Sequence, residues 1–307
     1  MKIRNSAGNL ISGEDPMESG FDLFSTIRRI EIATRTPARG MIQGIDRSFV
    51  RQTGIEFAEL REYVPGDDIR HLDWKVTARM DRPFMRECTG ERDQTYYFVI
   101  DRSGSCAFGS EIPKERMMLE IAASLMYAAY RDGEQVALCC FTDGIECLFP
   151  PGRGKKHLIA SLKMLSTHTP SKKATDLGPV IEYLCSAVKR RSAVVIISDF
   201  FCPVDTRLLS VLCRRHEVTA VQVVDRNEEY LPDIGMIMTE DEETGDQVLI
   251  DTSDRSVREA YASASSEYNR HLSSAFARAR AGFVRIGTDN DYAAILNRYF
   301  RRISRGI

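Results

Sequence analysis

From about residue 95 onward, short apolar runs alternate with stretches in which apolar residues recur at helical spacing. The run Thr95–Ile100 is β-branched and aromatic, which predicts a strand. Residues 113–130 carry apolar side chains at a spacing of four, which predicts a helix. The run Ser192–Ser198 is apolar between its ends, as in a strand buried on both faces of a parallel sheet. Strands that alternate with helices predict an α/β fold, an open and mostly parallel sheet with helices on both faces.

The rest of this region continues the alternation. We expect further strands at 135–141, 144–149, 217–224 and 283–286, and further helices at 156–165, 177–190, 204–215, 255–281 and about 292–300. Two of the connections have the composition of hairpin turns, Thr142-Asp143-Gly144 and, within a predicted hairpin at 235–251, Glu243-Thr244-Gly245.

Residues 1–94 have a different pattern. Residues 21–36 are a candidate helix, and 37–53 are irregular and rich in arginine. Leu72, Trp74, Val76 and Ala78 alternate with polar residues, which predicts a half-exposed strand. The segment is short and highly charged, so we expect a smaller N-terminal part with helix and β-structure that packs on an α/β domain at 95–307.

Composition narrows the classes of function. The chain has 307 residues, with 42 Lys and Arg against 44 Asp and Glu. It therefore lacks the net positive charge that would favour binding to nucleic acid or to anionic lipid. The longest apolar runs have about five residues, as at 193–197, and a membrane-spanning helix needs about 20. The N-terminus has no apolar core of the kind that marks a secretory signal. Most of the eight cysteines lie in apolar runs and none forms a CxxC pair, which favours reduced thiols and a cytoplasmic protein.

The candidate chemistry follows the predicted strands. Asp101-Arg102-Ser103-Gly104-Ser105 comes after the first of them, Thr175-Asp176 precedes a helix, and Asp199 ends the run at 192–198. Open α/β sheets gather their functional groups beyond the carboxyl ends of the strands. Carboxylate and hydroxyl oxygens suit Mg²⁺, Mn²⁺ or Ca²⁺ rather than Zn²⁺ or Cu²⁺. The alternative is that these side chains cap a turn and a helix and end a strand, with no metal.

This arrangement resembles the metal-ion-dependent adhesion site of von Willebrand factor A domains, in which a DxSxS loop is joined by a Thr and an Asp from two other loops. The resemblance implies that the metal ligands are Asp101, Ser103, Ser105, Thr175 and Asp199. It also implies that a carboxylate of a partner protein completes the coordination. The third motif departs from the usual TDG and is Ser198-Asp199-Phe200, whereas a TDG occurs at 142–144 and is interpreted here as a hairpin turn.

A second resemblance covers about residues 40–300. The segment 54–79, GIEFAELREYVPGDDIRHLDWKVTAR, the SDF motif and the acidic segment Asp241–Asp246 are similar to the signature of the domain-of-unknown-function fifty-eight family. This family comprises MoxR-associated proteins with a von Willebrand A-like domain. It implies a non-enzymatic, metal-dependent adaptor that works with a MoxR-type AAA+ ATPase and its client proteins in assembly or maturation.

Two alternatives remain for these motifs. The charges of segment 54–79 form either an ion-pair network or a partner-docking face. The candidate docking residues are Arg61, Tyr63, Asp67, Asp68, Arg70, Asp73, Trp74 and Arg79. The two carboxylates also allow a Mg²⁺-dependent phosphohydrolase that uses Asp101 and Asp199. Ser103 counts against that enzyme, because acid–base catalysis would need a second carboxylate there, and no lysine follows at a convincing position. The GRGKK at 152–156 lacks P-loop spacing, so any ATPase activity belongs to a partner.

Overall fold

The computed structural model describes residues 2–5, 56–63, 74–80, 82–89, 94–109, 112–240 and 247–304. The chain forms two compact units. One consists of residues 47–93, and the other combines residues 1–46 with residues 94–307.

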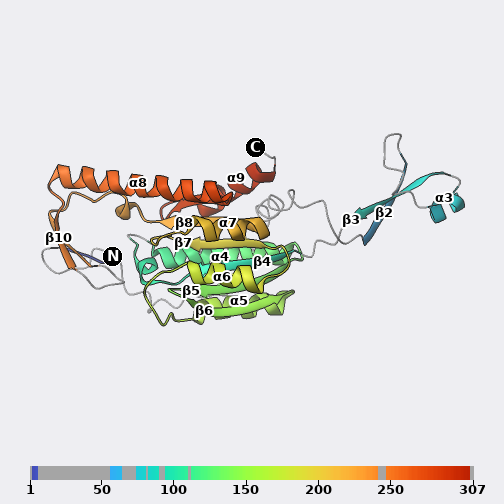
Figure 1. Ribbon diagram of the computed structural model, residues 1–307, viewed down its shortest axis with the longest axis horizontal. Coiled ribbons are helices and arrows are strands. Elements are labelled where there is room, and N and C mark those ends of the chain that lie inside the picture. The colour runs from blue at the N-terminus through green and yellow to red at the C-terminus, as the bar shows by residue number, and fades with distance from the viewer. Residues whose placement is uncertain are drawn as a thin grey trace. The chain divides into compact units, whose positions relative to one another are not determined.

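A six-stranded sheet is the centre of the larger unit (Figure 1). Its strands, in spatial order, are β11 (Gly282–Gly287), β8 (Glu217–Val224), β7 (Ala193–Ser198), β4 (Thr95–Asp101), β5 (Gln135–Phe141) and β6 (Ile145–Gly152). Neighbours are parallel except β5 and β6, which form the predicted antiparallel hairpin. Numbered by their order along the chain, the strands form the doubly wound arrangement 3-2-1-4-5-6. The chain adds strands outward from β4 on one side and then outward from β7 on the other, so the switch point of strand order lies between β4 and β7. The predicted fold class, an open and mostly parallel α/β sheet, is confirmed.

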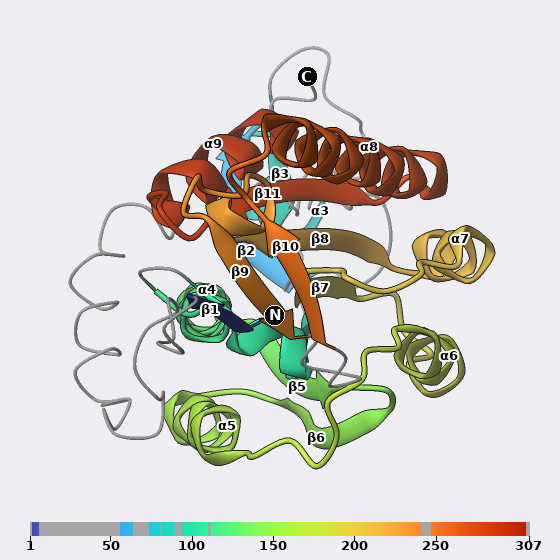
Figure 2. The same ribbon diagram turned by 90° about the vertical axis from the view of Figure 1, so that its left-hand side faces the viewer.

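Helices cover both faces of this sheet (Figure 2). On one face lie α4 (Lys114–Arg131), α5 (Lys155–Thr167) and α9 (Tyr292–Ser304). On the other lie α6 (Gly178–Ala187), α7 (Thr206–Arg215) and α8 (Arg255–Ala279). The predicted apolar stripe of α4 is buried, because it faces the sheet; it consists of Met117, Ile121, Leu125 and Ala129.

In the central strand β7, apolar and polar residues do not alternate, because both faces of the strand are covered. In β7, Val195 and Ile197 enter the core on the α4 side, while Val194 and Ile196 enter the core on the α6 side. All four are at most 2% exposed. A strand covered on both faces has no polar side, so its sequence is continuously apolar.

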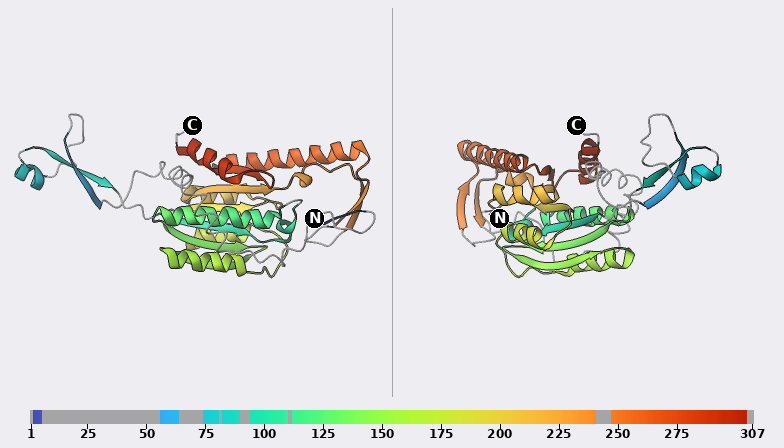
Figure 3. Two further views of the ribbon diagram at one scale, coloured as in Figure 1. Left: turned by 180° about the vertical axis from the view of Figure 1, so that it is seen from behind. Right: turned by 45° about the vertical axis from the view of Figure 1, so that its right-hand side comes forward.

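A three-stranded antiparallel sheet lies beyond one end of the large sheet (Figure 3). It consists of β1 (Lys2–Asn5), β9 (Met236–Glu240) and β10 (Gln247–Asp251). The two strands predicted within 235–251 are confirmed, whereas the turn at 243–245 and the acidic segment at 241–246 lie outside the described residues. Ile237 of β9 packs on Phe108, which follows the loop after β4. The small sheet therefore borders the candidate site.

Residues 47–93 form the smaller unit, in which β2 (Glu56–Glu62) pairs antiparallel with β3 (Phe84–Thr89). The strand predicted from Trp74, Val76 and Ala78 is wrong over the described part, because Trp74–Met80 is a helix, α3. Only four positions alternate, and the segment also contains good helix formers, among them Ala78, Arg79 and Met80. Leu72 and the predictions for 21–36 and 37–53 lie outside the described residues.

Among the described residues, no helix is both long and apolar enough to cross a membrane.

Candidate metal centre

Two buried carboxylates meet at the point where the strand order reverses. Asp101 is the last residue of β4, and Asp199 directly follows β7, which is the parallel neighbour of β4. Asp101 is 0% exposed and Asp199 is 3% exposed. One carboxylate oxygen of each and the sulfur of Cys106 lie within 4.8 Å of one another. Two of the predicted ligands are thus brought together from positions 98 residues apart in the chain.

Hydrogen bonds fix the carboxylate of Asp101. The backbone N–H of Ser103 donates to Oδ1 at 2.9 Å, and the hydroxyl of Ser198 donates to Oδ2 at 2.5 Å. Burial and the charge of Asp199 nevertheless raise the pKa of Asp101 to about 6. Ionising Asp101 next to a second buried carboxylate is unfavourable, and a cation placed between the two would relieve this cost.

The DxSxS loop brings its two hydroxyls to the same place. It continues into a short 3₁₀ helix, η3 (Gly104–Ala107). The Oγ atoms of Ser103 and Ser105 are 3.1 Å apart, and the hydroxyl of Ser105 donates to Asp199. The predicted set of Asp101, Ser103, Ser105 and Asp199 is therefore gathered at one point.

The fifth predicted ligand, Thr175, lies on the segment that precedes α6 and is half-buried. The N–H of Gly104 donates to the carbonyl of Lys173 on the same segment at 2.8 Å, which ties this segment to the DxSxS loop. Thr175 thus lies on the loop that the resemblance implied, and its role as a ligand stays a prediction.

A buried lysine, which the sequence analysis missed, also belongs to the centre. Lys114 Nζ lies 2.6 Å from Asp199 Oδ2 and 2.6 Å from Glu228 Oε1, and Lys114 is 1% exposed. Burial alone would lower the pKa of Lys114, but the two carboxylates outweigh it and raise the pKa above its ordinary value. Burial opposes the ionisation of Asp199, yet the ammonium of Lys114 holds the pKa of Asp199 below its ordinary value.

Weak signals for these two residues were present in the sequence. Lys114 begins α4, and a cation in the first turn of a helix is disfavoured by the helix dipole unless it has another partner. Glu228 belongs to η4 (Arg226–Glu228), which follows the end of β8 at the same edge of the sheet. Neither signal indicates that the two side chains meet.

The SDF motif forms a tight turn behind Asp199. Phe200 has a φ of 55°, in the left-handed region that glycine adopts at little cost. Its N–H donates to Ser198 Oγ at 2.7 Å, and the N–H of Phe201 donates to Asp199 Oδ1 at 3.0 Å. Phe200 thus stands at the sequence position of the glycine in TDG and adopts a backbone conformation that costs glycine little. Phe201 is 70% exposed and forms part of the surface beside the carboxylates.

The donor atoms fit a hard divalent cation. The carboxylates of Asp101 and Asp199 and the hydroxyls of Ser103 and Ser105 are all oxygen ligands of the kind that Mg²⁺, Mn²⁺ and Ca²⁺ prefer. Burial and the two neighbouring carboxylates raise the pKa of the Cys106 thiol well above its ordinary value. A protonated thiol is a poor metal ligand, so Cys106 does not change the preference of the centre for hard cations.

The TDG at Thr142-Asp143-Gly144 is a hairpin turn, as predicted. The N–H of Thr142 donates to the carbonyl of Gly144 at 2.9 Å, and the Thr142 hydroxyl donates to Glu146 at 2.9 Å.

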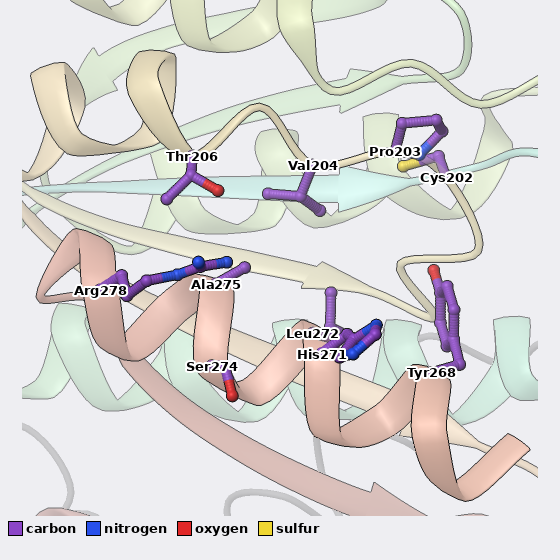
Figure 4. A pocket seen from close by; sticks show the side chains of 10 residues that line it. All are labelled: Cys202, Pro203, Val204, Thr206, Tyr268, His271, Leu272, Ser274, Ala275 and Arg278. Atoms are coloured by element: carbon purple, nitrogen blue, oxygen red, sulfur yellow. The ribbon is translucent and has the colours of Figure 1, made fainter.

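A groove of about 570 Å³ lies between α7 and α8 (Figure 4). Tyr268, His271 and Arg278 of α8 line one side, and Thr206 at the start of α7 lines the other. Neither Asp101 nor Asp199 lines it. The groove is therefore distinct from the carboxylate centre.

The candidate docking residues lie in the smaller unit. Arg61 is in β2, Trp74 begins α3, and Arg79 is exposed in the last turn of that helix. The N–H of Tyr63 donates to the carbonyl of Pro83 at 2.9 Å. The other candidates lie outside the described residues; they are Asp67, Asp68, Arg70 and Asp73. The docking role of this set stays a prediction.

The strand order, together with the DxSxS loop and the third-loop Asp at its switch point, defines a von Willebrand A-like α/β protein. Residues 59–271 match the family described as protein of unknown function DUF58, and the chain belongs to this family.

Two bacterial proteins illustrate the similarity to known sequences. The uncharacterized protein Rv1480 of Mycobacterium tuberculosis is 29% identical, and the similarity covers 92% of this chain and 90% of the relative. The uncharacterized protein YeaD of Bacillus subtilis is 27% identical over 36% of this chain and 25% of its own length.

Among solved structures, BatB from Bacteroides thetaiotaomicron superposes with a TM-score of 0.43 at 13% identity, covering 69% of this chain and 99% of that chain. The SpRpn10 VWA domain superposes with a TM-score of 0.37 at 11% identity, covering 70% of this chain and 98% of the domain.

Proposed function

We propose that this chain is a non-enzymatic, metal-dependent interaction module that works with a MoxR-type AAA+ ATPase in the assembly or maturation of other proteins. The observation that carries this proposal is the convergence of Asp101, Ser103, Ser105 and Asp199 at the switch point of the sheet. Membership of the family supports it, because the segment 54–79 resembles the signature of MoxR-associated proteins. The proposed place of action is the cytoplasm, and the free thiols of the described cysteines support a reducing compartment.

The proposed ion is Mg²⁺, with Mn²⁺ or Ca²⁺ as substitutes of the same chemistry. When bound, it would supply a Lewis-acidic position that accepts a carboxylate oxygen of the partner. Asp101 and Asp199 would hold the ion by charge, and the two serine hydroxyls would orient it. Exposed Phe201, beside Asp199, would add apolar contact area to the docking surface, since aromatic side chains are common anchors at interfaces.

The experiment compares capture of a purified MoxR-type ATPase from the same cell by the full chain and its variants. Wild type and Asp101→Asn are each tested in magnesium buffer and in EDTA. Asp143→Asn is the matched control, because Asp143 is the acidic residue of the TDG turn and pairs with Lys172 at the surface. We expect capture by wild type and Asp143→Asn in magnesium, and loss of capture in EDTA or with Asp101→Asn. Capture that survives both EDTA and Asp101→Asn would overturn the metal-dependent module.

The phosphohydrolase is the second candidate, and one observation favours it. No lysine follows these motifs at a convincing position in the sequence, but in the folded chain Lys114 lies against Asp199. A cation beside two carboxylates is suited to binding a phosphoryl group. Against this, Asp101 is fully buried and both of its oxygens accept hydrogen bonds, so it is not presented as a nucleophile. Turnover of p-nitrophenyl phosphate that disappears in Asp101→Asn would establish the enzyme instead.

A further inference from the structure

The candidate metal centre already contains a cation that belongs to the chain. The ammonium of Lys114 lies between the carboxylates of Asp199 and Glu228, and the carboxylate of Asp101 lies next to that of Asp199. The ammonium is hydrogen-bonded to Asp199 and Glu228 but not to Asp101. The residues that would bind a divalent ion and the residues that bind the lysine therefore share one member, Asp199.

Both oxygens of Asp199 have donors. Oδ2 accepts from Lys114 Nζ at 2.6 Å, and Oδ1 accepts from the N–H of Phe201 at 3.0 Å, while the Ser105 hydroxyl also donates to this carboxylate. A divalent ion placed between Asp101 and Asp199 would have to share Asp199 with an ammonium. Two cations on one buried carboxylate repel each other strongly, because little water is present to screen them.

Glu228 offers the ammonium a second anchor. Its Oε1 lies 2.6 Å from Lys114 Nζ, and its Oε2 accepts from the N–H of Asp225 at 3.2 Å within a capping box. The hydroxyl of Tyr261 donates to the Glu228 carbonyl and further fixes this turn. Glu228 is thus held in place by contacts that do not involve the metal ligands, and Lys114 can keep it as a partner without Asp199.

We propose that Lys114 is the resident counter-ion of Asp199 and limits the affinity of the centre for divalent cations, and that Glu228 retains the ammonium when an ion takes Asp199. This inference rests on the proposed function in one respect, namely that the carboxylates bind a divalent ion. It adds a means of regulation, because a partner that draws Lys114 towards Glu228 would strengthen ion binding.

The test is a titration of Mn²⁺ into the purified full chain, with free Mn²⁺ measured by electron paramagnetic resonance. Lys114→Met removes the competing charge, and we expect it to bind Mn²⁺ about tenfold more tightly or better. Among the described residues, Glu228→Gln leaves Asp199 as the only charged partner of the ammonium, so we expect weaker binding than in wild type. Lys172→Met is the control, because Lys172 is exposed and pairs with Asp143 away from the centre, and we expect no change.

The double variant Lys114→Met/Glu228→Gln shows whether Glu228 acts by holding Lys114 or only through its own negative charge. If Glu228 acts through Lys114, then Glu228→Gln changes Mn²⁺ affinity much less in the Lys114→Met background than in wild type. The midpoint of thermal unfolding is a second readout. In EDTA, Lys114→Met leaves the buried carboxylate of Asp199 without the cation that it pairs with, which destabilises the folded chain. We expect a low midpoint in EDTA and a larger rise on adding Mn²⁺ than in wild type.

Three other outcomes also decide the inference. Equal Mn²⁺ affinity of wild type and Lys114→Met would show that Lys114 does not compete, and would leave the proposed function intact. If Lys114→Met does not fold even with Mn²⁺, unchanged or tighter binding by Glu228→Gln would reject the inference, and weaker binding would support it. Absence of binding by all variants at millimolar Mn²⁺ would reject both this inference and the metal-dependent part of the proposed function.

Discussion

The hydroxyl of Ser198 lies 2.5 Å from Asp101 Oδ2 and joins the last residues of the two central strands. Both residues are at most 1% exposed. The same hydroxyl oxygen accepts the N–H of Phe200 at 2.7 Å, so one side chain orients both the first carboxylate and the turn that follows the second. The geometry of the candidate metal centre therefore depends on a residue that is not itself a predicted ligand.

Ser198→Ala should destabilise the chain. The substitution removes a donor to a buried carboxylate and an acceptor for a buried N–H, which costs about 1–3 kcal/mol. Urea denaturation at pH 7 measures this loss. The control is Ser186→Ala, because the hydroxyl of Ser186 is exposed and bonds only to the carbonyl of Tyr183 within its own helix. Equal free energies of unfolding for the two variants would contradict the structural role of Ser198.

Stability should depend on pH through Asp101. Its pKa is raised from 3.8 to about 6 in the folded chain, so the folded state binds this proton more tightly than the unfolded state. The contribution of Asp101 to stability is fully present below about pH 4 and is lost as the pH rises through 6. At one pKa unit per 1.36 kcal/mol, the loss approaches about 3 kcal/mol.

The variant Asp101→Asn, which cannot ionise, tests this dependence. In EDTA at pH 8 it should be more stable than wild type, and the difference should shrink as the pH falls from 6 to 4. Guanidinium denaturation at pH 4, 5, 6 and 8 follows the difference. A difference that is constant over this range would mean that Asp101 does not titrate within it.

Phe200→Gly should destabilise the chain although it relieves backbone strain. Glycine tolerates the φ of 55° better than phenylalanine, which is worth about 1 kcal/mol. However, the Phe200 ring is fully buried, with its centroid 5.0 Å from that of Phe276, and losing such a ring costs about 3–5 kcal/mol. The net loss should be about 2–4 kcal/mol in urea denaturation. The control is Phe201→Ala, which should change stability little because Phe201 is exposed. If Phe200→Gly were more stable than wild type, the cost of the φ angle would outweigh the packing of the ring.

Cys147 should be the most reactive of the thiols on the β5–β6 hairpin. It lies directly opposite Cys140, and a hydrogen bond from Cys140 lowers the pKa of Cys147 to about 7, against the opposing effect of burial. Burial raises the pKa of Cys139 to about 12. At pH 7 roughly half of Cys147 is thiolate, so iodoacetamide should label it before Cys139.

Peptide mass spectrometry after timed quenching measures this order of labelling. The rate at Cys147 should fall as the pH drops from 8 to 6, because the thiolate is lost. The variant Cys147→Ser should lose the fast phase. A fast phase that persists in this variant would assign the reactivity to another cysteine.

Local patterns in the sequence predicted most of the larger unit because each pattern reports one element and its buried face. The spacing of Met117 and Ile121 placed α4, and the unbroken run before Ser198 indicated a strand with two covered faces. The same approach failed at Trp74–Met80, where only a few residues support a period and helix propensity decides the local conformation.

The sequence by itself determined the α/β fold, the family and the carboxylates that follow the central strands, because periodicity and motifs are local properties of the chain. Only the tertiary structure decided which charges share the centre. Lys114 is 85 residues from Asp199 and 114 residues from Glu228, and the three meet because parallel strands end at the same edge of the sheet, where the first turn of α4 also lies. The burial that this packing imposes also sets their ionisation, since desolvation and neighbouring charges are properties of the folded site and not of the residue.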